Sequence, residues 1–265
     1  MADITVRAVH VLHIADSVAA EDTRVAGQLL HAFGLHKPLI ACDAHRESEA
    51  CAGILARLAA GERVVLCSDA GTPAVSDPGA RVVAAVREAG YRVLPIPGVS
   101  SLTTAVSASG LVDAAFTFHA FAPSKGKLRS DFYRALCAAP LPQVWFEAPH
   151  RMEDAFKLLS QLAPQRPLCI ARELTKQFED IVTIACAAAP AWLAAKSARS
   201  KGEFVLTLDA QAATELTGSE LEALALAQLL SSELPASKAA ALAAKHYGAD
   251  RSAVYGALLA AKTST

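Results

Sequence analysis

Short apolar runs alternate with helical patterns in the first part of the chain, and this alternation limits the fold more than any other feature. The runs predict strands at residues 17–20, 38–42, 63–67 and 91–94. The patterns between them predict helices at residues 5–13, 23–33, 47–60, 80–89 and 101–109. Asp3 is expected to cap the first of these helices, and glycines end the others. Strands separated by helices form βαβ units, so the sequence predicts a mostly parallel sheet.

A second αβ unit is expected between residues 116 and 209, after a link at residues 113–115. Its apolar runs predict strands at residues 116–118, 144–146, 168–172, 181–184 and 203–208. These strands again alternate with helical or polar segments. The chain therefore continues in the α/β class rather than changing to an all-helical or all-β one.

From Thr217 onward the composition changes to alanine-rich helix. Ser219 and Glu222 have the spacing of a capping box, and Asp250 is expected to cap a last helix after a turn at Gly248. Two short helices about a glycine turn have a helix-turn-helix shape. The predicted fold is α/β with two αβ domains, residues 1–112 and 113–212, and a small helical domain at residues 213–265.

Composition excludes several classes of protein. Hydrophobic residues make up 53% of the chain and charged residues 19%, which excludes an intrinsically disordered chain. No apolar run approaches the roughly 18–20 residues of a membrane span. The net charge is −1, so any contact with RNA must use a local basic patch. The six cysteines form no C-x-x-C pair and the first residues do not resemble a secretion signal, which favours a reducing, cytoplasmic location.

Two loops that follow predicted strands have the composition of ligand-binding loops. The first, residues 67–79, reads Cys-Ser-Asp-Ala-Gly-Thr-Pro-Ala-Val-Ser-Asp-Pro-Gly, and the second, residues 95–101, reads Pro-Ile-Pro-Gly-Val-Ser-Ser. Ligands of open parallel sheets bind at loops of this position, and the serine pair can cap a helix or offer hydroxyls to a ligand. The alternative for each is an ordinary turn rich in Gly, Pro, Ser and Asp. Neither loop has the P-loop or the G-x-G-x-x-G pattern, which argues against ATP- and NAD-dependent enzymes.

Charged residues gather at three places in the second unit. Phe-Glu-Ala-Pro-His-Arg (146–151) and Ala-Arg-Glu-Leu-Thr-Lys (171–176) each follow a predicted strand, and Ser-Lys-Gly-Lys-Leu-Arg (124–129) is a basic loop. The strand ends indicate a polar site, with a helix start and an exposed charged loop as the alternatives. The basic loop can hold phosphates, although a solvated loop is the default. His10 and His13 have no third ligand cluster, so no metal site is predicted.

Five motifs occur in order along nearly the whole chain and resemble one family. They are S-D-A-G-T-P-x-x-S-D-P-G, P-x-P-G-x-S-S, F-E-x-P-H-R, A-R-E-L-T-K and G-E-F-V. Together they resemble the tetrapyrrole methylase-like superfamily. Within it they are most similar to the bacterial methyltransferases that modify the ribose 2′-hydroxyl of a cytidine in 16S rRNA. The basic loop and the alanine-rich helical tail also resemble this group.

The resemblance implies an enzyme that holds S-adenosylmethionine in a cleft between two αβ domains and acts on 16S rRNA or the small ribosomal subunit. It also implies a homodimer, without a membrane or a metal. The positions that match the family's cofactor motifs are Asp69, Ala70, Gly71, Thr72, Val75, Ser100, Ser101, Phe146, Glu147, Leu174 and Glu203. The candidates for assisting the sugar hydroxyl are Glu147, His150 and Lys176, and the candidates for holding RNA phosphates are Lys125, Lys127, Arg129 and Arg151.

Members of the family begin with a further strand and a Pro-Ile-Gly-Asn-type loop, directly before a stretch that matches residues 3–8 here. The resemblance therefore implies that the first strand of the first sheet is missing from this chain. Its loss is expected to leave unpaired backbone at a sheet edge and a site open on one side.

Two other functions remain open from the sequence. A methylase of a tetrapyrrole or another small molecule would use the same cleft, but it needs neither the basic loop nor the helical tail. A nucleic-acid-binding regulator with an inert cofactor fold would use the tail, which carries few cations: Lys238, Lys245 and Arg251.

Overall fold

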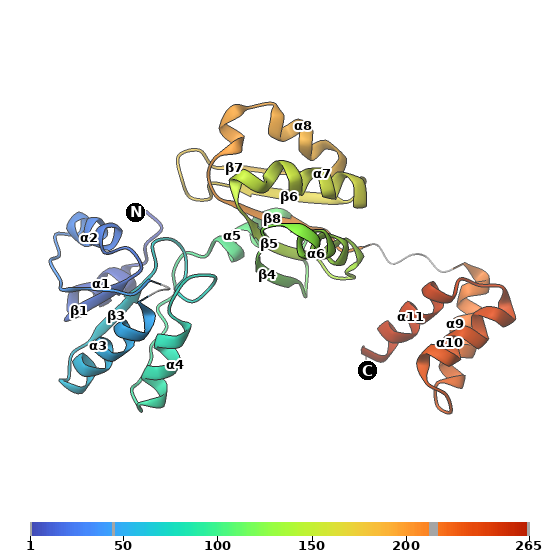
Figure 1. Ribbon diagram of the computed structural model, residues 1–265, viewed down its shortest axis with the longest axis horizontal. Coiled ribbons are helices and arrows are strands. Elements are labelled where there is room, and N and C mark those ends of the chain that lie inside the picture. The colour runs from blue at the N-terminus through green and yellow to red at the C-terminus, as the bar shows by residue number, and fades with distance from the viewer. Residues whose placement is uncertain (1, 44–45, 212–216, 264–265) are drawn as a thin grey trace. The chain divides into compact units, whose positions relative to one another are not determined.

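The computed structural model describes residues 2–43, 46–211 and 217–263 of the chain. These residues form two compact units, 1–211 and 212–265, each considered by itself (Figure 1). The larger unit contains two sheets, and the smaller one is helical. None of the helices in the described ranges combines the length and apolar character that a bilayer-spanning segment needs.

The first sheet is parallel throughout, which confirms the expected βαβ arrangement. Its strands run in the order β2-β1-β3, and they are β1 (Ser17–Ala20), β2 (Leu39–Ala41) and β3 (Val64–Cys67). Successive side chains of a strand point to opposite faces, so Val18 packs on one side and Ala19 on the other. The helices on Val18's side are α1 (Val6–Ile14) and α2 (Thr23–Ala32), and those on Ala19's side are α3 (Glu47–Ala59) and α4 (Ala80–Glu88).

Two local expectations for this region are wrong. Thr5, not Asp3, caps α1, because its Oγ1 accepts a hydrogen bond from the backbone N–H of Ala8 at 3.1 Å. Residues 91–94 do not form a strand, and they have no strand partner within the described chain. Tyr91 and Val93 nevertheless pack against the core under α3 and α4, which accounts for their apolar character.

The second sheet is mixed and lies between helices on both faces. Its order is β4-β5-β8-β6-β7. Strand β4 is parallel to β5, and the pairs β5–β8, β8–β6 and β6–β7 are antiparallel. The strands are β4 (Thr117–Phe121), β5 (Gln143–Glu147), β6 (Pro167–Arg172), β7 (Asp180–Ala185) and β8 (Phe204–Leu208). Trp145, Ile170 and Leu206 face a core that is covered by α6 (Gly126–Ala138), α7 (Met152–Leu162) and α8 (Ala189–Ala194). Short 3₁₀ turns occupy Pro149–Arg151, Cys186–Ala188 and Ser197–Ser200.

Helix α5 (Ser101–Ser109) covers the opposite face of this second sheet. Its fully buried Ala105 packs with Val144 and Val205, and the Thr183 hydroxyl donates to the Ser109 carbonyl at 3.2 Å. The packing thus joins α5 to the second sheet, although the sequence analysis placed it in the first domain. The domain limits themselves stay predictions, and the limit at residues 212/213 lies outside the described residues.

The smaller unit contains α9 (Gly218–Leu230), α10 (Ala236–Tyr247) and α11 (Arg251–Thr263), which confirms the helical tail. The capping box is formed by Thr217 and Glu220, two residues before the predicted pair. Asp250 caps α11 as expected, since its Oδ1 accepts the N–H of Ala253 at 2.8 Å. The core consists largely of alanines on α9 and α10, and their small side chains let the helices approach closely.

Candidate functional site

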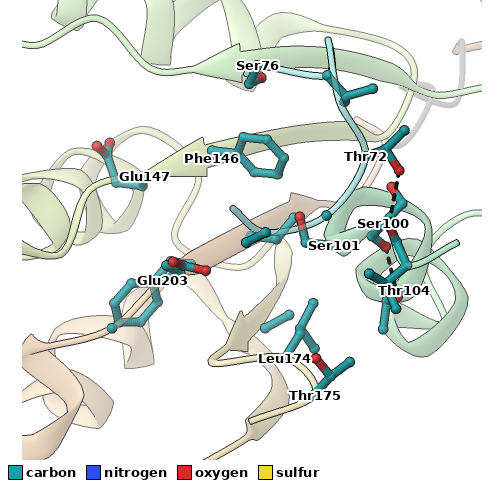
Figure 2. A pocket seen from close by; sticks show the side chains of 18 of the residues that line it. Thr72, Ser76, Ser100, Ser101, Thr104, Phe146, Glu147, Leu174, Thr175 and Glu203 are labelled. Atoms are coloured by element: carbon teal, nitrogen blue, oxygen red, sulfur yellow. Dashed lines mark hydrogen bonds between the residues drawn. The ribbon is translucent and has the colours of Figure 1, made fainter. Parts of the chain in front are cut away.

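A cavity of about 390 Å³ lies in the larger unit, where loops of both sheets meet (Figure 2). This volume falls within the range of about 300–1,000 Å³ typical of small-molecule sites. Its lining comprises residues 70–72, 75–77, 99–101, 104, 121, 146–149, 171, 174–176 and 202–205. The five segments that carry the expected cofactor positions therefore come together around one space, although they are spread over much of the chain.

The two glycine- and proline-rich loops are tied to each other at the cavity wall. Thr72 Oγ1 donates a hydrogen bond to the carbonyl oxygen of Val99 at 2.9 Å (Figure 2). Asp69 does not line the cavity. Its Oδ1 accepts the backbone N–H of Asp22 at 3.0 Å, which anchors the start of the first loop to the N-cap of α2.

The first loop holds a backbone conformation that most side chains disfavour. Ala74 and Ser76 have φ angles of 66° and 68°, in the left-handed region. Gly79 ends the loop at φ 131°, where an added Cβ would lie 2.8 Å from Leu66 Cδ2. Glu47, from α3, fixes this end because its Oε1 accepts the N–H of Gly79 at 3.1 Å. Strained backbone that is supported in this way is a feature of preformed binding loops.

The first turn of α5 also faces the cavity. Ser100 occupies the N-cap position, and Ser101 and Thr104 follow on the same side of the helix. The predicted capping by the Ser100 hydroxyl is not made within the described chain, so this hydroxyl is available to a ligand. Backbone N–H groups at a helix N-terminus attract anionic groups such as a carboxylate.

An apolar wall comes from the second sheet. Phe146, Ala171 and Val205 contribute side chains from three strands. The ring of Phe146 makes edge-to-face contacts with Phe118 and Phe121, at centroid distances of 5.1 and 5.3 Å. Such a surface suits one face of a flat aromatic ligand.

A lysine of the cavity lining lies between two carboxylates. Lys176 Nζ is 2.9 Å from Glu173 Oε1 and 3.0 Å from Glu203 Oε2. Partial burial disfavours the ammonium form, but the hydrogen bonds and charges of the two glutamates outweigh it and raise the pKa of Lys176. Lys176 is therefore a cation at neutral pH, which makes it a donor of hydrogen bonds rather than an acceptor of protons.

The loop that carries Lys176 is rigidly held. The buried Arg172 donates hydrogen bonds to the carbonyl oxygens of Lys201, Phe178 and Ala198, at 2.8, 3.0 and 2.7 Å. These bonds clamp the two loops that flank the cavity. The loop's own backbone is strained at Glu173, whose φ is 52°.

We expect Gly202→Ala to disturb this wall. Gly202 has a φ of 99°, and an added Cβ would lie 2.6 Å from Glu173 Cγ. Glu173 would have to move away from Lys176, so the affinity for a ligand of the cavity should fall, by about tenfold for a loss near 1.4 kcal/mol. Isothermal titration calorimetry checks this result, with Gly53→Ala on α3 as the control, because its added Cβ meets no atom within 4 Å. Equal affinities of the two variants would contradict it.

Asp77 adds an acidic side chain to the cavity lining. Burial is the main cause that raises the pKa of Asp77, and the charges of Asp69 and Glu203 add to it. A bound cation would relieve this repulsion. The cavity thus favours a ligand that joins a flat ring to a positive centre.

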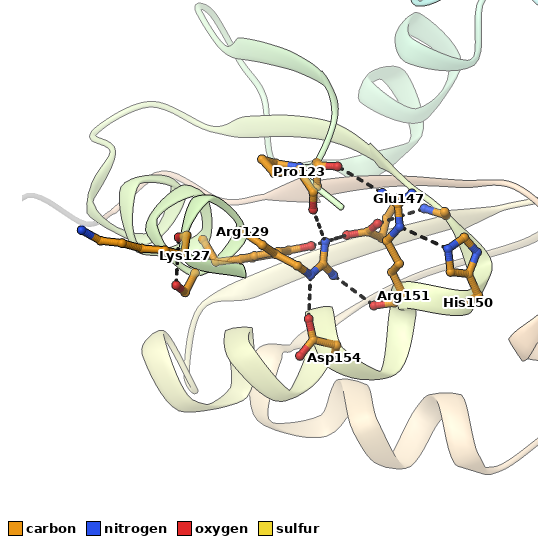
Figure 3. Close-up of polar contacts among 11 residues, drawn as sticks. Pro123, Lys127, Arg129, Glu147, His150, Arg151 and Asp154 are labelled. Atoms are coloured by element: carbon orange, nitrogen blue, oxygen red, sulfur yellow. Dashed lines mark hydrogen bonds and ion pairs between the residues drawn. The ribbon is translucent and has the colours of Figure 1, made fainter. Parts of the chain in front are cut away.

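Glu147 and Arg129 form a buried ion pair beneath the cavity (Figure 3). Glu147 Oε2 accepts from Arg129 Nη1 at 2.8 Å and from the Tyr133 hydroxyl at 2.5 Å, and both side chains of the pair are at most 4% exposed. Arg129 also donates to Asp154 Oδ2 at 2.6 Å. The structure therefore does not offer Arg129 to an RNA phosphate, and it gives the Glu147 carboxylate a structural role at the floor of the cavity.

The other polar candidates are distributed around this pair. Lys125 and Lys127 are exposed, and Figure 3 shows Lys127 extending away from the ion-pair network. The expected basic loop is only partly a loop, because residues 126–129 form the first turn of α6 and Lys125 is its N-cap. Arg151 donates to the carbonyl oxygen of Ala122 at 3.3 Å and contacts His150. His150 and Arg151 lie outside the cavity lining, so of the three candidates for assisting the hydroxyl only Lys176 and Glu147 reach it.

All the predicted cofactor positions except Asp69 line the cavity. Other residues of the lining were not among the predicted positions: Ser76, Asp77, Val99, Thr104, Phe121, Ala148, Pro149, Ala171, Thr175, Gly202, Phe204 and Val205. Most of them lie inside or directly beside the quoted motifs. The sequence offered a weak indication for Thr104, because a residue one helical turn after Ser100 lies on the same face of the helix. It offered no indication that Phe121 lines the cavity.

Comparisons with known proteins agree with this geometry. The sequence pattern of the tetrapyrrole (corrin/porphyrin) methylases matches residues 1–190, and that of the RsmI C-terminal HTH domain matches residues 217–262. The ribosomal RNA small subunit methyltransferase I of Escherichia coli O157:H7 is 41% identical over 216 residues, which are 81% of this chain and 76% of that protein.

Two solved structures are similar in fold. The methyltransferase CobJ has a TM-score of 0.59 at 18% sequence identity, over 82% of this chain and 92% of that one. A uroporphyrin-III C-methyltransferase from Thermus thermophilus, complexed with S-adenyl homocysteine, has a TM-score of 0.52 at 19% identity, over 77% and 90%. At these identities the likeness concerns the fold alone, and it confirms the predicted fold class.

Proposed function

The chain belongs to the tetrapyrrole methylase family, in the group of ribosomal RNA small subunit methyltransferase I, and we propose that it methylates the ribose 2′-hydroxyl of a cytidine in 16S rRNA. The observation that carries this proposal is the cavity lined by all the segments with expected cofactor positions. The exposed Lys125 and Lys127 lie at the start of α6, the helix whose Arg129 pairs with Glu147 at the cavity floor. The reaction would take place in the cytoplasm, on the rRNA or on the assembled small subunit.

The residues of the cavity fit S-adenosylmethionine. Its adenine is flat, and the apolar wall around Phe146 offers a matching surface. Its carboxylate suits the N-terminus of α5 with the hydroxyls of Ser100 and Ser101. Its positive centre would relieve the repulsion around Asp77 and Glu203. When bound there, S-adenosylmethionine supplies an electrophilic methyl group.

The protein's own contribution would be position and charge. The tied loops at Thr72 and Val99 hold the donor side, so that the reacting oxygen can approach in line with the methyl group. Lys176 would place its ammonium near the ribose oxygen and stabilise the negative charge that develops as the hydroxyl releases its proton to water. Glu147 would act through the floor of the cavity as a positioning residue.

Methyl transfer from labelled S-adenosylmethionine tests the function. The purified protein is incubated with small subunits from a strain that lacks the modification, and a tetrapyrrole is the control substrate. We expect label in 16S rRNA, at the 2′-oxygen of one cytidine after nuclease digestion and mass spectrometry. Label in the tetrapyrrole, or at a base, would contradict the proposal.

The basic loop is expected to bind the RNA backbone. Replacing both Lys125 and Lys127 by Ala should weaken binding of a 16S rRNA fragment and flatten its salt dependence by about 0.7 per lost phosphate contact. The affinity for S-adenosylmethionine should not change, since neither side chain lines the cavity. A filter-binding titration at several salt concentrations measures this. The matched control is Lys157→Ala with Lys196→Ala, two exposed lysines elsewhere; equal salt slopes for both pairs would contradict it.

A homodimer is part of the same proposal. The helical unit exposes Leu221 and Leu229, with 55% and 74% of their surface accessible, one helical turn on either side of Ala225 on α9. Exposed leucines on one helix face favour association with a second apolar surface. Light scattering should give twice the mass of one chain, and a monomer at micromolar concentration would contradict the dimer.

A further inference from the structure

On the basis of the proposed function, we propose that Phe121 is a stacking platform for a base of the RNA strand. Phe121 at the end of β4, Lys125 at the N-cap of α6 and Lys127 in the first turn of α6 would then form one single-strand binding element. Phe121 lies outside the sequence motifs, and the surface proposed for adenine is centred on its neighbour Phe146.

Phe121 is an unusual side chain for the edge of a cavity. It lines the cavity, yet 55% of its surface is exposed. Its ring meets Phe146 edge to face, with an interplanar angle of 61°. This contact fixes the ring while much of its surface stays open. An apolar ring left open beside a polar site indicates a place for a flat partner.

A strained backbone conformation before Phe121 directs its side chain toward the cavity. Phe118 pairs with Val144 and Phe121 pairs with Phe146, so three steps on β4 match two steps on β5. The extra residue is a β-bulge, and Ala120 within it has a φ of 54°, in the left-handed region. Without the bulge, Phe118 and Phe121 would point to opposite faces of the sheet. Bulges near active sites re-aim side chains in this way.

The charges that follow select a nucleic acid strand as the partner. Lys125 and Lys127 are exposed and come four and six residues after Phe121. An aromatic ring beside cations that track a backbone is the usual design of single-strand binding surfaces. A single strand is favoured over a duplex because a duplex stacks its own bases and hides their faces. Phe121 would thus hold the target base, or its neighbour, while the lysines hold the phosphates.

The test compares two probes of equal length: a fluorescent oligo-cytidine RNA and an abasic ribose-phosphate strand. The wild-type protein should prefer the strand with bases. Phe121→Ala should reduce this preference roughly 5- to 150-fold, the range for the loss of one base stack. Phe121→Tyr should retain it. Phe178→Ala is the matched control, since Phe178 is 66% exposed on another loop and does not line the cavity.

Each outcome decides the proposal. An unchanged base preference in Phe121→Ala overturns it, and so does a loss of S-adenosylhomocysteine affinity without a loss of base preference, which would assign the ring to the cofactor. A base preference that depends on Phe121 supports it. If the base preference depends on Phe121 but the wild-type protein does not methylate the small subunit, the proposed substrate is wrong and the stacking role of Phe121 is supported. If the wild type methylates the small subunit but Phe121→Ala keeps the base preference, the proposed function is supported and the stacking role is wrong.

Discussion

Arg129→Met should lower the unfolding midpoint of the 211-residue unit by about 6–20 °C. The substitution leaves the Glu147 carboxylate, whose side chain is 0% exposed, without its cationic partner. Breaking a buried pair on one side typically costs about 3–5 kcal/mol, and each kcal/mol shifts the midpoint of a unit of this size by about 2–4 °C. Differential scanning calorimetry measures the shift.

Two further variants separate the buried charge from a general loss of packing. Asp154→Asn removes the exposed partner of Arg129, whose side chain is 59% accessible, and should cost less than about 1 kcal/mol. Arg129→Met combined with Glu147→Leu leaves no charge behind and should be more stable than Arg129→Met alone. A double variant less stable than the single one would show that the buried charge is not the cause.

Lys176→Met should reduce methyl transfer by about 10²–10³-fold. This is the usual loss when one preorganised donor to a developing oxyanion is removed. Lys176→Arg keeps a cation at this place and should retain more activity than Lys176→Met. Single-turnover rates with saturating RNA measure the effect, and the affinity for S-adenosylhomocysteine, measured separately, shows whether binding is also altered. Equal rates for Lys176→Met and the wild type would remove Lys176 from the mechanism.

The pH dependence distinguishes an ammonium from a base at this position. The pKa of Lys176 is raised above 10.5 and that of Glu173 is lowered below 4.5. The contribution of Lys176 to stability is therefore present below 10.5 and is lost as the pH rises through its raised value. The contribution of Glu173 to stability is present above pH 4.5, and it is lost as the pH falls through the lowered pKa of Glu173. From pH 5 to 10 the charge of Lys176 does not change, so its ionisation should not alter the rate. A general base at this position would instead lose activity as the pH falls through its pKa.

The sequence predicted the local elements well because their signals are local. The strand Ser17–Ala20 and the helix Ser101–Ser109 were placed at their observed limits. The strand at residues 91–94 was wrong because a strand also needs a neighbour to accept its hydrogen bonds, and that neighbour cannot be seen in a short window. The cap of α9 was displaced by two residues because Ser219 and Thr217 are both good capping residues.

The sequence predicted the site residues whose type itself suits contact with a ligand. It did not predict those whose role depends on whether the fold buries the side chain or exposes it. The glycine–proline loops line the cavity as expected, since their residue types serve a ligand directly. Arg129 resembles its exposed neighbours Lys125 and Lys127 in sequence, and only the fold shows that it points to Glu147, 18 residues away. Phe121 was missed because its direction depends on a bulge, which a pattern of alternation does not reveal.

The cavity wall is assembled from segments as distant as residues 70 and 205, so the binding pocket exists only when both sheets are in place. Any ligand that fills it must therefore favour the native state over every partly folded one. At a hundredfold excess over its dissociation constant this linkage is worth about 2.7 kcal/mol. Thermal shift or hydrogen exchange should register occupancy in both sheets at once. The lifetime of such a protein against proteolysis would then follow the supply of its small-molecule ligand.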